Sequence, residues 1–403
     1  MKNNLVIKNS ISETFSKNKR KIKNNPNISK NLNKIFQNLD KKQDVFHLLS
    51  KKLKFSFKKS SLKKYKKFKK AIIIGMGGSI LGTKAIHSFL RHKIKKDFLF
   101  LDNLDEVQTK EVIHKKNLNN YLFIIVSKSG NTIETLTNMN LLKKKLNSSN
   151  TILIVENKNN SINALSKKIK TSIFEHKKYV GGRYSVLSEV GMIPSYLMGL
   201  KIENFRKNLL DYFKNKKKNF LVGSVSKISE MYLSKQIKSI VLLSYSPQLL
   251  DFSYWCQQLL AESLGKQGKG LLPIVSIGPK DHHSLLQLYL DGPKDKMFYV
   301  LSSKNIYNFK VGGNYLDKKS KFLKNKKLSE IILSQKDSLL ENLKKKDLPF
   351  REIHVNNFSE ETIGELFSYF MLETAMIGKL INVNPFNQPS VENVKILTKK
   401  FLS

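Results

Sequence analysis

The chain has 403 residues, of which 40% are hydrophobic, and a formal net charge of +42. This length is enough for two domains with cores of their own, and no apolar run approaches the length of a membrane span. The one cysteine, Cys256, excludes an intrachain disulfide, and its apolar surroundings predict a packed core thiol. Because the first residues lack the apolar core of a signal peptide, we expect a cytoplasmic protein with no membrane partner.

The positive charge is spread along the whole chain. Lysines occur in every segment together with many Asn and Ile residues, whereas there are only five arginines. A nucleic-acid-binding protein would concentrate its charge in a patch or tail and would favour the forked guanidinium. Since AT-rich codons encode Lys, Asn and Ile, compositional drift accounts for the pattern better. We expect no specific nucleic-acid partner, only weak attraction to polyanions.

The predicted elements begin with helices and then alternate between strands and helices. Apolar residues at helical spacing from Leu32 to Leu53 predict one or two helices in a highly charged start. From Lys70 onwards, short apolar runs alternate with helical stretches, and a helical bridge from Met192 to Leu233 separates two rounds of this pattern. The predicted strands are 71–74, 98–101, 121–126 and 151–155 in the first round, and 240–243, 274–277, 298–301 and 351–355 in the second.

This alternation predicts the fold class α/β, with two doubly wound parallel sheets covered by helices on both faces. The predicted organisation, in chain order, is a basic helical segment, a first α/β domain, a helical bridge, a second α/β domain, and a C-terminal helix with a tail: 1–66, 67–200, 201–235, 236–357 and 358–403.

A cluster of hydroxyls lies where the strand 121–126 turns into a helix. The segment Ser127–Thr132 reads SKSGNT and is called the phosphate loop below. Free backbone N–H groups and the positive end of a helix dipole meet at such a turn, and they favour an anion. An ordinary helix N-cap is the alternative, but it leaves several donors without a purpose. The side chains that add donors are Ser127, Lys128, Ser129 and Thr132.

A glycine-rich turn precedes the phosphate loop by one βα unit. Residues 75–82, the glycine loop, read GMGGSILG, follow a strand and open a helix. Glycines permit a tight turn and a close approach to a ligand, which Gly78 and Ser79 would contact. A dinucleotide fingerprint would need an acidic residue about 20 positions further on, which is not clearly placed. A tight connection without a binding role also remains open.

Two further motifs carry groups suited to proton transfer. Arg183 directly follows Gly181 and Gly182, and its planar guanidinium suits a negative substrate oxygen, although a surface arginine is the alternative. Gln258 and Glu262 are four residues apart and share one face of a helix. A carboxylate among apolar neighbours suits a proton-transfer base; the alternative is an exposed glutamate paired with Lys266.

Two polar motifs lie towards the end of the chain. His282 and His283 are adjacent, and a neutral imidazole relays protons near neutral pH; a satisfied polar residue at a helix start is the alternative. Too few further ligands lie at suitable spacing for a metal site. Residues 384–389, with two prolines, would hold Gln388 in place, while Lys395 projects from the following helix, where a solvated lysine is the simpler interpretation.

Taken together, these motifs resemble the glucose-6-phosphate isomerase family, which is built from two flavodoxin-like sugar isomerase domains. The resemblance runs from about Gly75 to Lys395 in unbroken order. The motifs that carry it are GMGGSILG, SKSGNTIET, GGRYSVLS, QLLAESLGK, HHSLLQ and NPFNQPSVENVK.

The resemblance implies an aldose–ketose isomerase that interconverts glucose 6-phosphate and fructose 6-phosphate in glycolysis and gluconeogenesis, with no cofactor and no metal. It implies that Glu262 is the base, that Arg183 stabilises the enediolate, and that His283 and Lys395 open the sugar ring. In the family the active histidine comes from a second subunit, so a homodimer is implied. The residues implied to bind substrate are Gly78, Ser79, Ser127, Lys128, Ser129, Thr132, Gly182, Gln258 and Gln388.

Two positions depart from the family pattern. Asn131 stands where Thr is common, and Ser390 stands where Gly is common and would be awkward if the backbone there needs a positive φ. Other functions also stay open: a sugar-phosphate-sensing regulator, which would leave Glu262, His283 and Lys395 without a purpose, a polyanion-binding protein, and an isomerase that also accepts mannose 6-phosphate.

Overall fold

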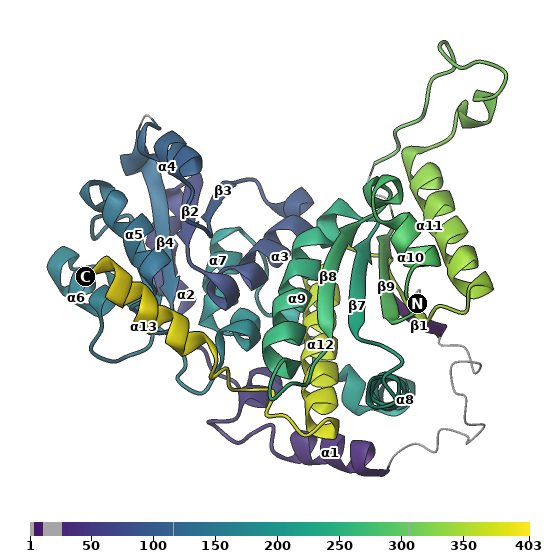
Figure 1. Cartoon of the computed structure of the whole chain (residues 1–403). Coiled ribbons are helices and arrows are strands. Elements are labelled where there is room, and N and C mark those ends of the chain that lie inside the picture. Colours follow the sequence, from purple (N-terminus) through teal and green to yellow (C-terminus); the bar gives the residue numbers. More distant parts are fainter. Residues whose placement is uncertain (1–3, 11–25, 116, 305–306) are drawn as a thin grey trace.

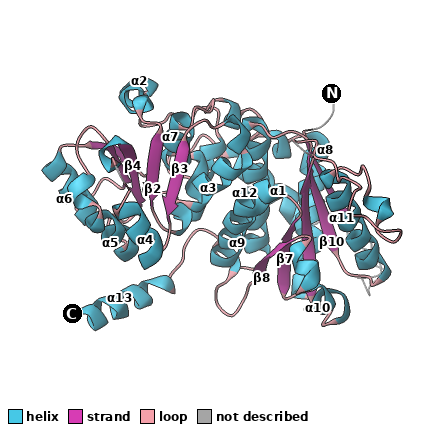
Figure 2. Ribbon diagram, turned by 90° about the horizontal axis from the view of Figure 1, so that it is seen from above, coloured by secondary structure: helices cyan, strands magenta, loops and turns pink. Residues whose placement is uncertain are grey.

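A computed structural model describes residues 4–10, 26–115, 117–304 and 307–403. Two five-stranded sheets stand on either side of a central layer of helices (Figure 1). Figure 2, which looks at the molecule from above, shows α3, α9 and α12 between the sheets. Further helices cover the outer faces, so each sheet is buried on both sides, as the predicted α/β class requires.

The first sheet is entirely parallel and has the strand order β3-β2-β4-β5-β6. Counted within the domain this is the order 2-1-3-4-5, which is the flavodoxin-like form of a doubly wound sheet. Its strands are Lys70–Ile74 (β2), Asp97–Leu101 (β3), Tyr121–Ser127 (β4), Thr151–Val155 (β5) and Ser172–Glu175 (β6). The outer face is covered by Glu106–Ile113 (α4), Ile133–Leu141 (α5) and Ser161–Ile169 (α6).

The second sheet has the strand order β1-β10-β9-β7-β8. Its four parallel strands repeat the order 2-1-3-4, and β1 from the start of the chain fills the fifth place, antiparallel to β10. The strands are Leu5–Ser10 (β1), Ser239–Ser244 (β7), Leu272–Ile277 (β8), Lys296–Ser303 (β9) and Phe350–Val355 (β10). Leu286–Asp291 (α10) and Leu328–Lys345 (α11) cover the outer face.

One hydrophobic core runs through the central layer and joins the inner faces of both sheets. The longest helix in it, α12, is apolar around most of its circumference and is buried along almost its whole length, as expected for a helix between two layers. Ser359 caps α12 by accepting a hydrogen bond from the backbone N–H of Thr362. The helices of this layer are Leu81–Phe89 (α3), Glu189–Leu197 (α7), Leu250–Leu264 (α9) and Glu360–Leu380 (α12).

The remaining helices lie at the edges of the molecule. Pro26–Gln37 (α1) and Asn215–Leu233 (α8) pack against α12, and Lys59–Leu62 (α2) precedes the first sheet. The last helix, Val391–Leu402 (α13), is exposed and stands apart from the two sheets (Figure 2).

All eight strands predicted from apolar runs are confirmed, whereas β1 and β6 were not predicted. Their apolar runs are short, since β1 has only Leu5, Val6 and Ile7 in succession and β6 only Ile173 and Phe174, so their sequences carry a weak apolar signal. Part of the predicted N-terminal segment, residues 1–3 and 11–25, lies outside the described residues.

A buried ion pair holds the second sheet against the central layer. Arg351 on β10 donates from Nη1 to both carboxylate oxygens of Glu373 on α12, at 2.7 and 2.9 Å, and neither side chain is exposed. Arg351 Nε donates to Asn9 Oδ1 at 2.7 Å, which ties β1 to the same cluster. The fully buried Cys256 lies near Glu373, and burial raises the pKa of its thiol, so the predicted core thiol is confirmed.

We expect Arg351→Met to lower the free energy of unfolding by about 3–5 kcal/mol, because it leaves the Glu373 carboxylate buried without its cation. Urea unfolding followed by circular dichroism measures the loss. Lys344→Met is the control, since Lys344 forms an ion pair with Glu341 on the exposed face of α11; it should cost less than about 1 kcal/mol. Equal losses in both variants would contradict this account.

Candidate active site

The glycine loop approaches the segment around Arg183 more closely than any side chain would permit. A Cβ atom placed on Gly78 would lie 2.1 Å from the carbonyl carbon of Gly182 and 2.4 Å from the backbone nitrogen of Arg183. Gly77 has a φ of +51°, which glycine adopts without strain. The two glycine-containing segments therefore pack backbone against backbone, and this contact fixes the backbone position from which the Arg183 side chain extends.

The Arg183 side chain is fully buried and uses all five of its N–H donors. Its partners come from α9 and from the loop before α13, so the guanidinium joins three distant segments of the chain. The bonds run from Nε to Ser263 Oγ (2.8 Å), from Nη1 to Gln388 Oε1 (2.7 Å) and Glu262 Oε2 (3.2 Å), and from Nη2 to the backbone oxygens of Pro385 (2.6 Å) and Asn387 (3.1 Å).

Glu262 lies near the end of α9 and keeps 28% of its side chain exposed. Its Oε1 accepts a hydrogen bond of 2.8 Å from Gln258 Nε2, one helical turn earlier, while Oε2 faces Arg183. Lys266 does not take part: its Nζ donates to the backbone oxygens of Ser263 and Asn384, at 2.9 and 2.6 Å. The carboxylate is thus held in a fixed orientation and remains open to a ligand.

The hydroxyls of the phosphate loop are linked through Thr132 and lie beside the glycine loop, because β2 and β4 are neighbours in the sheet. Ser127 Oγ lies 2.9 Å from Thr132 Oγ1 and accepts from the backbone N–H of Gly130 at 3.1 Å. Ser129 Oγ lies 3.4 Å from Thr132 Oγ1. Burial lowers the pKa of Lys128. The loop is therefore held in shape by its own hydrogen bonds.

The structure gives a physical account of both departures from the family pattern. The Asn131 side chain accepts a hydrogen bond of 3.0 Å from the backbone N–H of Ser161, so it ties the phosphate loop to the first turn of α6. Ser390 has a φ of −70°, which any residue adopts without strain. The awkward backbone considered for Ser390 does not occur.

Two of the predicted site residues lie away from the Arg183 cluster. His283 is exposed, in a short turn at Lys280–His283 that follows the carboxyl end of β8, whereas α9 delivers Glu262 towards the opposite end of the same strand. The six residues of β8 span about 20 Å. Lys395 lies on α13, where its Nζ pairs with Glu392 at 2.6 Å. Among the described residues, no hydrogen bond or ion pair links either side chain to Glu262.

Sequence reasoning missed several residues that hold the cluster together. Ser263 bonds to both Arg183 and the hydroxyl of Tyr184, which lies 3.0 Å away. The carbonyls of Pro385 and Asn387 contribute through the backbone, which no residue pattern reveals. Their places in the sequence did give a signal: Ser263 lies inside the motif QLLAESLGK, and Pro385 and Asn387 lie inside the motif NPFNQPSVENVK.

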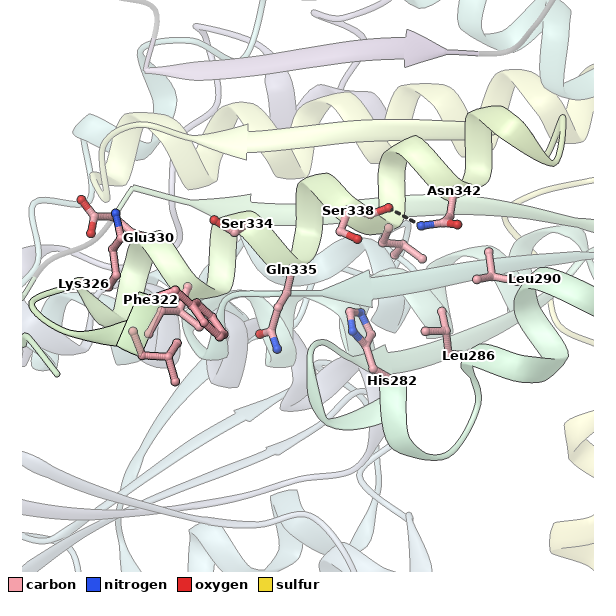
Figure 3. A pocket seen from close by; sticks show the side chains of 13 residues that line it. His282, Leu286, Leu290, Phe322, Lys326, Glu330, Ser334, Gln335, Ser338 and Asn342 are labelled. Carbon is pink, nitrogen blue, oxygen red and sulfur yellow. Dashed lines mark hydrogen bonds between the residues drawn. The ribbon is translucent and has the colours of Figure 1, made fainter. Parts of the chain in front are cut away.

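A separate groove of about 690 Å³ lies between α10 and α11, on the outer side of the second sheet (Figure 3). His282 lines it, and this side chain contacts the hydroxyl of Tyr245. None of the residues bonded to Arg183 lines this groove. Across the described ranges, no three His, Cys, Asp or Glu side chains are grouped so as to hold a metal, and no helix is long and apolar enough to cross a membrane.

The fold defines the class: an α/β protein with two sheets, of the sugar isomerase type. Residues 17–271 match the model of the family described as phosphoglucose isomerase. The chain is 35% identical to the glucose-6-phosphate isomerase of Methanocaldococcus jannaschii over 83% of this chain and 85% of that protein. It is 31% identical to that of Campylobacter jejuni over 83% and 86%. The chain belongs to the phosphoglucose isomerase family.

Solved structures support the same fold at lower sequence identity. A hypothetical protein from Thermus thermophilus covers 99% of this chain and 100% of its own length, with a TM-score of 0.83 and 22% identity. A glucose-6-phosphate isomerase from Chlamydia trachomatis covers 85% of this chain and 71% of its own length, with a TM-score of 0.71 and 19% identity.

The bond from Lys266 to the loop before α13 should make activity depend on pH. Burial lowers the pKa of Lys266 to about 8, so the charged ammonium holds the Asn384 carbonyl below that pH and loses its charge above it. We expect Lys266→Met to reduce isomerase activity several-fold at pH 7 and to approach the wild type above pH 9.

The measurement is the ratio of the two activities across this pH range. Lys269→Met is the control, because Lys269 also donates to a backbone oxygen, that of Ile381, at 3.0 Å. A ratio for Lys266→Met that stays constant with pH would show that the charge is not what matters.

Proposed function

We propose that this chain interconverts glucose 6-phosphate and fructose 6-phosphate through an enediolate intermediate, in glycolysis and gluconeogenesis. The observation that carries the proposal is the joint position of a fixed carboxylate, Glu262, and a buried guanidinium, Arg183, 3.2 Å apart and packed against the glycine loop. Isomerisation of this kind needs a base at two neighbouring carbons and a cation for the developing oxyanion.

In this proposal Glu262 moves the proton between C2 and C1 of the open-chain sugar. One carboxylate serves both carbons because they are adjacent. The hydrogen bond from Gln258 fixes the direction of the carboxylate, which leaves only a small reorganisation for the proton transfer.

Arg183 would stabilise the enediolate oxygen, but its five donors are already occupied. A substrate oxygen therefore gains a donor when one acceptor leaves. Gln388 is the best suited, since its side-chain amide can rotate, whereas Pro385 and Asn387 bind through backbone carbonyls. A displaced Gln388 amide would then be free to hold the substrate, in keeping with the positioning role inferred for it.

The substrate phosphate would bind at the phosphate loop, remote from the reacting carbons. The hydroxyls of Ser127, Ser129 and Thr132 and the ammonium of Lys128 suit a phosphate dianion, while Gly78, Ser79 and Gly182 would line the sugar. Binding energy from this end orients the sugar over Glu262.

Ring opening would require His283 and Lys395, and the position of His283 favours a homodimer, which we expect to act in the cytoplasm. His283 lies beyond the far end of β8 from Glu262 of its own chain, so a second copy is the natural source of the imidazole. Such an arrangement is self-consistent under twofold symmetry, because each chain gives its His283 and receives one. Lys395 lies seven residues beyond Gln388, on the exposed helix α13.

We expect Glu262→Gln to lower kcat by about 10²–10⁴-fold with little change in KM, because the amide keeps the contacts with Gln258 but cannot accept the proton. A coupled assay of fructose 6-phosphate conversion measures both constants. Glu341→Gln, on the exposed face of α11, should behave like the wild type. Activity of Glu262→Gln within tenfold of the wild type would remove Glu262 from the base role.

Mixing two inactive variants tests the shared site. If His283 acts on a second copy, hybrids of Glu262→Gln and His283→Ala chains contain one site in which both residues are intact. We expect co-expression with two affinity tags to recover about a quarter of wild-type activity in the mixture, since half of the dimers are hybrids with one working site each. No recovery in purified hybrids would place both residues in the same chain.

A further inference from the structure

Three residues at the carboxyl edge of the first sheet form a row that begins at Lys128 in the phosphate loop. In the register of β4, β5 and β6, Ser127 pairs with Val155 and Val155 pairs with Glu175. The next residues of the three strands are Lys128, Glu156 and His176. Two positions earlier in each strand, the side chains of Val126, Ile154 and Phe174 all belong to the central core. The pairing continues one residue past the strand ends, where the N–H of Glu156 bonds to the Lys128 carbonyl and that of His176 to the Val155 carbonyl, so the period of two directs the three side chains to this same face.

His176 is a buried, neutral acceptor at the end of this row. Its side chain is not exposed, and its Nδ1 lies 3.4 Å from the backbone oxygen of Lys177. Because a carbonyl only accepts, Nδ1 carries the proton and Nε2 keeps a lone pair. Burial lowers the pKa of His176 to about 4, so the ring is uncharged at neutral pH. Nε2 is buried and has no hydrogen-bond partner among the residues that the structure describes.

The charges that act on the imidazole are those of its neighbours in the row. Both the Lys128 ammonium and the Glu156 carboxylate interact with it electrostatically. Glu156 Oε2 is engaged by Lys158 at 3.0 Å, whereas Lys128 forms no ion pair with a carboxylate within the described part of the chain. The Glu156 carboxylate attracts the Lys128 ammonium, whereas the charges of Lys158 and Arg183 repel it. Lys128 is therefore the cationic donor available to this row.

A neutral acceptor suits a lysine that must bind phosphate. A carboxylate paired with Lys128 would fix its position but offset its charge and repel a phosphate dianion. An imidazole lone pair fixes the ammonium by a hydrogen bond and leaves its full charge for the ligand. A buried Nε2 lone pair without a donor costs free energy, so the hydrogen bond is favourable for His176 as well as for Lys128.

We propose that His176 is a positioning residue, whose Nε2 accepts a hydrogen bond from the Lys128 ammonium and holds it at the phosphate loop for the 6-phosphate of the substrate. This inference rests on the proposed function, since it assigns Lys128 to the phosphate of that substrate. It adds to the phosphate site a residue that directly follows β6, one of the two strands that sequence analysis did not predict.

The test compares His176→Phe, which keeps a ring of similar size, with His176→Gln, which restores a neutral acceptor. We expect His176→Phe to raise KM for fructose 6-phosphate about tenfold with kcat within about twofold, as for the loss of one hydrogen bond to a charged group. His176→Gln should recover most of this affinity. A KM of His176→Phe equal to that of the wild type, in a protein with a cooperative thermal transition, would overturn the proposal.

A double-mutant cycle separates positioning from packing. In the background of Lys128→Met, His176→Phe should have no further effect on KM, because the group it positions is gone. Equal effects of His176→Phe with and without Lys128 would assign it a packing role and overturn the proposal. His87→Phe is the matched control: its Nε2 is also buried and unpartnered among the described residues, but its ring packs against Phe98 and Phe100. It should leave KM unchanged.

Calorimetric titration with inorganic phosphate keeps this test independent of the reaction. If the wild type binds phosphate but shows no turnover, the proposed function fails, and the affinities of the His176 variants still decide the role of His176. We expect the same order by this measure, with the wild type and His176→Gln binding phosphate more tightly than His176→Phe. Equal phosphate affinity in all three proteins would overturn the positioning role.

Discussion

The buried guanidinium of Arg183 is the constraint on which the rest of the site depends. A cation removed from water is stable only when its donors are all matched, and here the matching acceptors come from α9 and from the loop that follows α12. Arg183 directly follows Gly182, whose backbone packs so closely against Gly78 that a side chain on Gly78 would not fit. The charge requirement of one residue thus ties α9 and the loop that follows α12 to the glycine loop.

The two sheets share a strand order but contribute opposite ends to the site. The first sheet supplies loops at the carboxyl ends of β2 and β4, where doubly wound folds commonly bind ligands. The second supplies the C-terminal end of α9, which has run back towards the amino ends of its strands. The carboxyl edge of the second sheet, which carries His283, faces away from Glu262 of its own chain. This asymmetry is the basis of the proposal that His283 acts on a second copy of the chain.

Sequence reasoning captured what local patterns encode. Apolar runs located eight of the ten strands, and the rarity of arginine singled out Arg183. It could not locate β1 or β6, because their runs of three and two apolar residues are too short to stand out. It also could not find the carbonyls of Pro385 and Asn387, or the bond from Asn131 to the first turn of α6. Those contacts join residues distant in the chain, and only the folded backbone brings them together.

The antiparallel pairing of β1 with β10 has a consequence for how the protein is made. Leu5 pairs with Val355, so β1 stays without its partner strand until β10, which follows it by more than 300 residues, has been translated. Until then its edge is unpaired and available to other chains. Contacts between such distant residues also form slowly, because a very long loop must close first. The second sheet is therefore completed only after β10 has been synthesised, and the first sheet, whose strands end at Glu175, can assemble well before it.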